Sequence, residues 1–185
     1  MDKVKKAIII LENGDMILKD KEYIQKLYSS GFGSMRGEVL KLDPLEVLYL
    51  VYTNRARVLE NGKEIPFKTL VRMFQKNYSD IWIKFLIYHD LRQRGFITMK
   101  GYTTGLELRV AEKKAEKNRP KTIVFGLVEG RKVKFSSIRF MIDRAMSLGK
   151  NVVLAIVDKE GNITYYTVSF SRSTMTKDTR PSSED

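Results

Sequence analysis

The chain has 185 residues, 43% of them hydrophobic, and a formal net charge of +12. This length allows one domain or two small ones, and the charge favours an anionic partner, with nucleic acid first. The lysine-rich surface of a heat-adapted protein is the alternative explanation. The absence of cysteine excludes a disulfide scaffold and thiolate metal sites, and it fits a cytoplasmic location. The apolar run at residues 7–11 is too short for export or for a membrane span.

The first part of the chain predicts a small α/β domain over residues 1–78. Asp20 is placed to cap a helix that ends at Gly31. The sequence DPLE at residues 43–46 supplies a capping side chain, a proline in the first turn and a glutamate that completes a capping box. A further helix is expected after Pro66. Its apolar residues recur with helical spacing at Phe67, Leu70, Val71 and Phe74. So small a unit should pack on the part that follows.

Residues 79–170 predict a second domain, with a central mixed sheet flanked by helices. The helix at residues 81–94 is apolar nearly all round in its first turns and should lie in the core. Strands are expected at residues 96–99, 106–110 and 123–128. Because residues 112–121 are almost entirely polar, we expect them to form a mobile loop. Ser136 or Ser137 should cap the next helix.

The chain closes with a predicted β-hairpin. Six apolar residues at 152–157 are typical of a strand buried on both faces. Residues 158–162 supply turn chemistry, and residues 163–170 are rich in β-branched and aromatic side chains. Residues 171–185 have almost no apolar side chains, which predicts a disordered tail. The expected fold class is therefore α/β, of a mixed α+β kind, in two domains.

Several of these segments resemble the archaeal tRNA-splicing endonucleases, which cut introns from precursor RNA. The motif YHDLRQRGF at residues 88–96 leads into a hairpin that begins with Lys100 and Gly101, as it does in that family. The other landmarks are residues 11–15, 45–50 and 157–166. Each motif alone is weak, but their order along the chain makes the resemblance specific.

The resemblance implies a catalytic site that needs no metal or cofactor. In active relatives a tyrosine serves as base, a histidine as acid and a lysine stabilises the negative charge that develops. The matching positions here hold Ala111, Arg119 and Asn151, with Lys121 as a second candidate for the acid position. Arginine does not release a proton near neutral pH. We therefore expect no catalytic residue in this chain, which would not be an enzyme on its own.

The resemblance also implies a partner. The chain is expected to be the structural subunit of a two-plus-two heterotetramer, whose catalytic homologue cleaves precursor tRNA at bulge-containing splice sites. Asp158 and Glu160 lie in the turn that enters a neighbouring subunit in the family. Tyr165 and Val168 lie on the final strand, which is expected to pair with another C-terminal domain.

Basic residues near the end of the chain are the candidates for RNA contact. Arg144 matches an arginine that stacks on a bulged base in active relatives. Arg139, Lys150 and Arg131 are expected to attract phosphates without regard to sequence.

Two alternatives stay open. The chain could be a self-sufficient, metal-independent ribonuclease of the same family that uses Tyr102, Lys150 and His89. It could also be a stand-alone basic RNA-binding protein without a stable partner. The favoured hypothesis predicts an obligate complex, so the mass of the native complex would separate these possibilities.

Overall fold

The computed structural model describes residues 6–103 and 105–169, and the predicted disordered tail lies outside them. The first half of the chain forms a six-stranded sheet with the strand order β3-β4-β2-β1-β5-β6. Its strands are β1 (Ala7–Glu12), β2 (Asp15–Leu18), β3 (Ser34–Arg36), β4 (Val39–Leu42), β5 (Ala56–Glu60) and β6 (Lys63–Ile65). The pairing is antiparallel except between β1 and β5, which run parallel.

Three helices belong to this first lobe: α1 (Lys21–Ser29), α2 (Pro44–Tyr52) and α3 (Phe67–Gln75). The carboxylate of Asp20 caps α1 by accepting from two backbone amides. At α2 the predicted capping box is present, because Asp43 accepts from the amide of Leu45 while Glu46 accepts from the amide of Asp43 at 2.8 Å. Both of these predicted helix starts are confirmed.

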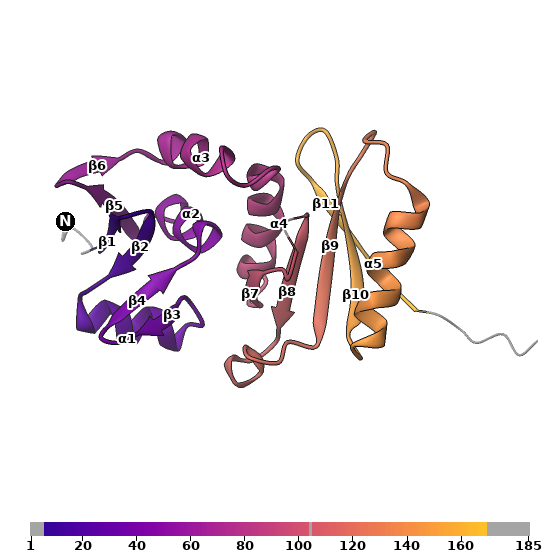
Figure 1. The fold of residues 1–185 in the computed structure, drawn as a ribbon, viewed down its shortest axis with the longest axis horizontal. Coiled ribbons are helices and arrows are strands. Elements are labelled where there is room, and N and C mark those ends of the chain that lie inside the picture. Colours follow the sequence, from indigo (N-terminus) through magenta and orange to yellow (C-terminus); the bar gives the residue numbers. More distant parts are fainter. Residues whose placement is uncertain (1–5, 104, 170–185) are drawn as a thin grey trace, which may run out of the picture.

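The second half of the chain forms a five-stranded sheet with the order β11-β10-β9-β8-β7. Its strands are β7 (Ile97–Lys100), β8 (Glu107–Ala111), β9 (Thr122–Val128), β10 (Asn151–Val157) and β11 (Ile163–Val168). Only β9 and β10 pair in parallel, so the sheet is mixed, as predicted. The helices α4 (Ile81–Gln93) and α5 (Phe135–Ser147) cover opposite faces of it (Figure 1).

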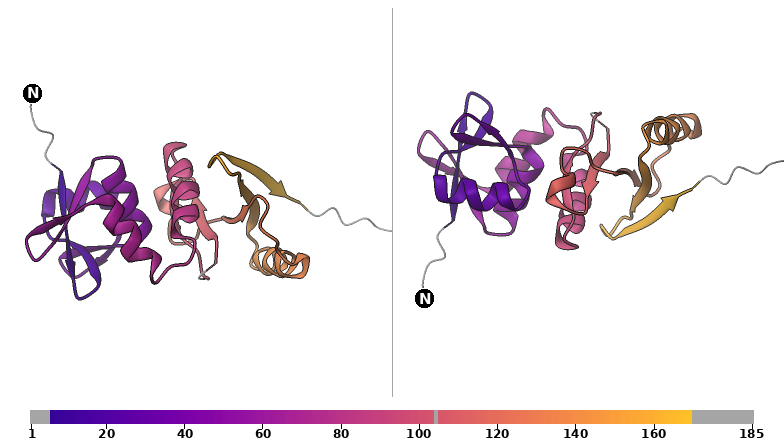
Figure 2. Two further views of the ribbon diagram at one scale, coloured as in Figure 1. Left: turned by 90° about the horizontal axis from the view of Figure 1, so that it is seen from above. Right: turned by 90° about the horizontal axis from the view of Figure 1, so that it is seen from below.

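The helix α4 lies between the two lobes in all the views (Figures 1 and 2). Its Phe85, Ile87 and Tyr88 are almost fully buried. The same hydrophobic cluster contains Leu48 of α2 on one side and Val124 of β9 on the other. One core therefore joins the lobes, as expected for a first unit too small to be stable alone.

Two local predictions differ from the structure. Residues 112–121 are not an unanchored loop: they contain the 3-10 helix η1 (Lys114–Glu116), which contacts the first lobe. The helix α5 begins one residue before Ser136, and Lys134 is its N-cap without a side-chain cap hydrogen bond. Among the described residues, no helix is both long enough and apolar enough to cross a membrane.

Candidate active site

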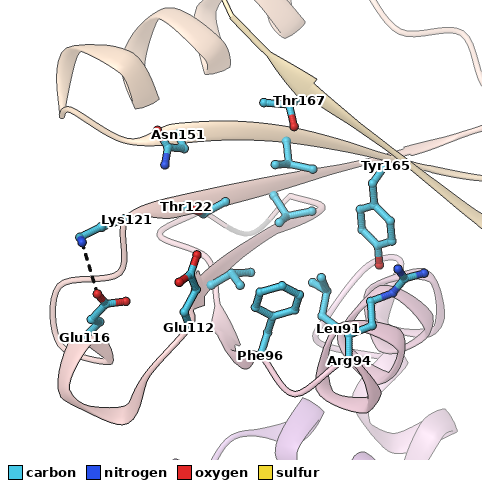
Figure 3. A pocket seen from close by; sticks show the side chains of 13 residues that line it. Leu91, Arg94, Phe96, Glu112, Glu116, Lys121, Thr122, Asn151, Tyr165 and Thr167 are labelled. Carbon is cyan, nitrogen blue, oxygen red and sulfur yellow. Dashed lines mark ion pairs between the residues drawn. The ribbon is translucent and has the colours of Figure 1, made fainter.

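A cavity of about 370 Å³ opens beside α4, where β8 ends and β9 and β10 begin (Figure 3). Both apolar side chains and charged or polar groups line it. Its lining residues include Arg94, Glu112, Glu116, Lys121, Asn151 and Tyr165. They come from α4, from the loop after β8, and from the last two strands. A concave apolar site with a few convergent polar groups is the usual form of a ligand or active site.

Strand alternation decides which residues of β8 reach this cavity. Val110 and Glu112 line it, whereas Ala111 is buried with Ile97 and Met99 in a separate small cluster. Successive side chains of a strand point to opposite faces, so Val110 and Glu112 share one side while Ala111 points to the other. The residue predicted for the position of the catalytic base is therefore not in the cavity, but its neighbour Glu112 is.

The same holds for the predicted acid position. Arg119 is exposed and is not among the residues that line the cavity. Lys121, the second candidate, lines it, and its amine forms an ion pair with Glu116 at 3.3 Å. Asn151 lines the cavity, and its backbone amide donates to the carbonyl of Lys121 at 2.8 Å. Of the three predicted positions, only Asn151 is in the cavity.

The groups that do reach the cavity can carry acid–base chemistry. Carboxylates of Glu112 and Glu116 and the amine of Lys121 face a common space (Figure 3). A carboxylate can accept a proton, and a fixed ammonium can stabilise negative charge as it develops. Glu112 and Glu116 were not predicted from the sequence as residues of a functional site. Continuing the strand alternation one residue beyond β8 was the signal that could have revealed Glu112.

Tyr165 closes the other end of the cavity. Its hydroxyl donates to Asp90 of α4 at 2.7 Å, and the guanidinium of Arg94 lies 5.2 Å from its ring centre. Burial, together with the hydrogen bond to Asp90, raises the pKa of Tyr165 above its ordinary value. This side chain, predicted to lie at a subunit interface, thus contacts its own α4.

The predicted RNA-binding residues lie in different surroundings within the second lobe. Arg131 forms two hydrogen bonds with Asp80 at 2.8 and 2.9 Å, and the amine of Lys150 donates to the carbonyl of Pro120. Arg139 pairs with Asp143 at 3.1 Å. Arg144 lines a second cavity of about 220 Å³ between α5 and the turn from β7 to β8.

Phe140 and Tyr102 are mostly exposed aromatic residues at this second cavity. Exposed aromatic rings beside basic side chains are the groups that stack on unpaired bases. Arg144 is therefore the one of the four candidates that lies in a setting suited to base stacking.

The predicted interface residues of the hairpin have different surroundings. Asp158 accepts from both the backbone and the side-chain amide of Asn162, and the side-chain hydrogen bond lowers the pKa of Asp158. Glu160 is exposed at the tip of the turn. Val168 packs partly against the cluster beneath α5. The acidic group that the turn presents outward is thus Glu160.

The three residues of the self-sufficient ribonuclease alternative do not meet. His89 packs against the rings of Tyr49, Tyr52 and Phe85, between α2 and α4. The amine of Lys150 is bound to a carbonyl, and Tyr102 lies at the turn after β7. None of the three lines the cavity beside Asn151.

Comparison with known proteins defines the class to which this architecture belongs. Residues 8–71 match the N-terminal domain of the tRNA intron endonucleases, and residues 81–165 match their catalytic C-terminal domain. The chain belongs to the tRNA intron endonuclease family.

Individual proteins with similar sequences support this family membership. A protein of Pyrococcus abyssi named tRNA-splicing endonuclease is 31% identical over 169 residues, which are 90% of this chain and 98% of the relative. A protein of the same name from Pyrococcus horikoshii is 32% identical with the same coverage. A tRNA-splicing endonuclease of Methanococcoides burtonii is 29% identical over 161 residues, 85% of this chain but 45% of the relative.

The prediction that this chain is not an enzyme on its own is wrong. The match to the catalytic domain over residues 81–165 and relatives named as endonucleases point to an enzyme. The prediction rested on three aligned positions, two of which do not line the cavity. Glu112, Glu116 and Lys121 do line it, so ionisable side chains remain in the cavity.

Proposed function

We propose that this chain is a subunit of a tRNA-splicing endonuclease that removes introns from precursor tRNA at bulge-containing splice sites in the cytoplasm. The observation that carries this proposal is the match of residues 81–165 to the catalytic domain, since that segment contains the cavity with Glu112, Glu116 and Lys121. The net charge of +12 supports a polyanionic substrate.

In the proposed assembly, two copies of this chain join two copies of a homologous subunit, and this chain contributes, besides its own cavity, contacts that hold the assembly together. Glu160 and the turn around it would contact the neighbouring subunit. The free edge of β11, which ends the strand order of the second sheet, would extend that sheet into another domain. Arg144, with Phe140 beside it, would hold an unpaired base of the splice site.

Native mass measurement and a cleavage assay on the same sample test this proposal. The chain is co-expressed with the homologous subunit of its own genome and purified as it assembles. We expect a mass equal to two of each chain, and cleavage of a precursor tRNA with bulged splice sites into exons and intron. A monomer, or a species made of this chain alone, would contradict the heterotetramer. An uncut precursor would contradict the nuclease function.

A further inference from the structure

The loop after β8 connects the cavity to the first lobe. Glu112, Glu116 and Lys121 of this loop line the cavity. Between them, the amine of Lys117 donates to the backbone carbonyl of Gly33 at 2.6 Å, across 84 residues of sequence. One short loop therefore contacts both the cavity and a domain that contributes no residue to its lining.

A second contact strengthens this attachment. The amine of Lys114 lies 4.6 Å from the ring centre of Tyr28, near the end of α1, and that of Lys117 lies 5.9 Å from the same ring. Cations held over an aromatic face at such distances are attracted by the ring. Two lysines, at the start and the C-cap of η1, thus lie over one tyrosine of the first lobe.

Gly33, whose carbonyl accepts the hydrogen bond from Lys117, is itself held in place. Gly33 is buried, and its amide donates to the buried carboxylate of Glu46 at 2.8 Å. Burial lowers the pKa of Lys117 and raises that of Glu46, and the attraction between the two charges opposes both shifts. A half-buried ammonium needs such partners, because burying a charge without them is costly. Its position is therefore defined by several groups.

We propose that Lys117 is a positioning residue for the cleavage reaction. By holding the middle of the loop on the first lobe, it fixes Glu116 and Lys121 in the wall of the cavity. The proposal rests on the proposed nuclease function. The first lobe thus holds the loop on the side away from the cavity and leaves the cavity open to the RNA.

The first arm of the test is kinetic and compares Lys117→Met with Lys113→Met. Lys113 is an exposed lysine of the same loop, so both variants lose one positive charge. A displacement of about 1 Å in a reacting group can cost on the order of 100-fold in rate. In the assembly that cleaves precursor tRNA, we expect Lys117→Met to lower kcat by about 10- to 100-fold with KM changed by less than about twofold. Lys113→Met should leave kcat unchanged, and Lys117→Arg should restore most of the rate.

The second arm does not depend on activity. Hydrogen exchange of the backbone amides at residues 112–121 is measured in the full chain, where we expect Lys117→Met to speed exchange at least about tenfold and Lys113→Met to have no effect. Unchanged exchange in Lys117→Met would refute the attachment. Faster exchange with an unchanged kcat would refute the positioning role. If the unaltered assembly cuts no precursor, the proposed function fails, while the exchange result still decides the attachment.

Discussion

Gly33 is at a position where a side chain meets two separate obstacles. Its φ is +63°, in the left-handed region that favours glycine. A Cβ there would lie 2.6 Å from Cγ of Leu40 and 2.9 Å from the carbonyl oxygen of Lys41, and backbone does not give way easily. The same residue joins Glu46 to Lys117, so its geometry matters to the core of the first lobe and to the loop at the cavity.

We expect Gly33→Ala to be clearly more destabilising than Gly37→Ala. Gly37 has a similar φ of +58° but nothing within 4 Å of an added Cβ, so it isolates the backbone cost. That cost is about 1 kcal/mol, and the clash at Gly33 should add roughly 1–3 kcal/mol. The free energies of unfolding from urea titrations measure both. Equal losses in the two variants would mean that Leu40 and the carbonyl of Lys41 both move aside without cost.

Single residues of the cavity could be predicted from the sequence only in part. The turn before β10 and the buried strand after it were evident in the sequence, and Asn151, which begins this strand, lines the cavity. Ala111 and Arg119 were not, because a sequence match fixes a position along the chain but not the face of the strand. A shift of one residue exchanges the faces, and here it separates Ala111 from Glu112.

At the scale of elements, β11 and α4 are joined by one polar link. The hydroxyl of Tyr165 and the guanidinium of Arg94 both bind the carboxylate of Asp90, at 2.7 and 2.8 Å. Tyr165 and Arg94 lie together at one end of the cavity, beside the helix that separates the lobes (Figure 3). The link therefore limits how far β11 can move away from α4.

Replacing Tyr165 by phenylalanine removes this hydrogen bond while leaving the ring. We expect a loss of about 0.5–1.5 kcal/mol in the free energy of unfolding. Tyr166→Phe is the matched control, because that side chain points to the other face and is 54% exposed, so its effect should stay within about 0.5 kcal/mol. Denaturant titration at neutral pH measures both. A larger loss in Tyr166→Phe would contradict the assignment of Tyr165 as the link.

Because the pKa of Tyr165 is raised, the effect of Tyr165→Phe on the free energy of unfolding should depend on pH. A tyrosine in the unfolded chain loses its proton near pH 10, whereas burial and Asp90 keep Tyr165 protonated in the folded chain. Its stabilising contribution is therefore complete below about pH 10 and falls as the pH rises through the raised pKa. The difference in unfolding free energy between the unaltered chain and Tyr165→Phe should be constant from pH 7 to 9 and smaller at pH 11. A difference that grows with pH would contradict this assignment.

Long, patterned elements could be predicted from the sequence, whereas short ones could not. The capping box of α2 and the hairpin of β10 and β11 follow from local chemistry, and both are present. The strands β3 and β6 have three residues each, too few to show alternation. The polarity of residues 112–121 suggested a mobile loop. Their contacts with Tyr28 and Gly33 are long-range, so no local sequence pattern predicts them.

At the scale of the whole molecule, the two lobes share α4 and one core but expose different groups. The outer face of α5 carries Phe135 and Phe140, both mostly exposed, together with Arg139 and Arg144. The turn with Glu160 and the free edge of β11 belong to the C-terminal hairpin instead. RNA contact and subunit contact are therefore proposed on different elements, and a substitution in one need not disturb the other.

Reversing the charge of Glu160 tests the subunit contact without disturbing the fold. Asp158 is unsuitable for this purpose, because its carboxylate accepts two hydrogen bonds from Asn162 within the turn. Glu160→Lys should weaken association with the homologous subunit, since a lysine would face the surface that the acidic turn is proposed to enter, and charge reversal at an interface opposes binding.

Glu38→Lys makes the same charge change at the exposed turn between β3 and β4 and should leave association intact. Titration of the two purified subunits, followed by native mass measurement, gives the dissociation constant of each variant. We expect a rise of at least about tenfold for Glu160→Lys. If both variants assemble as the unaltered chain does, the turn is not the contact. The free edge of β11, which neither substitution alters, is then left as the surface to hold the subunits together.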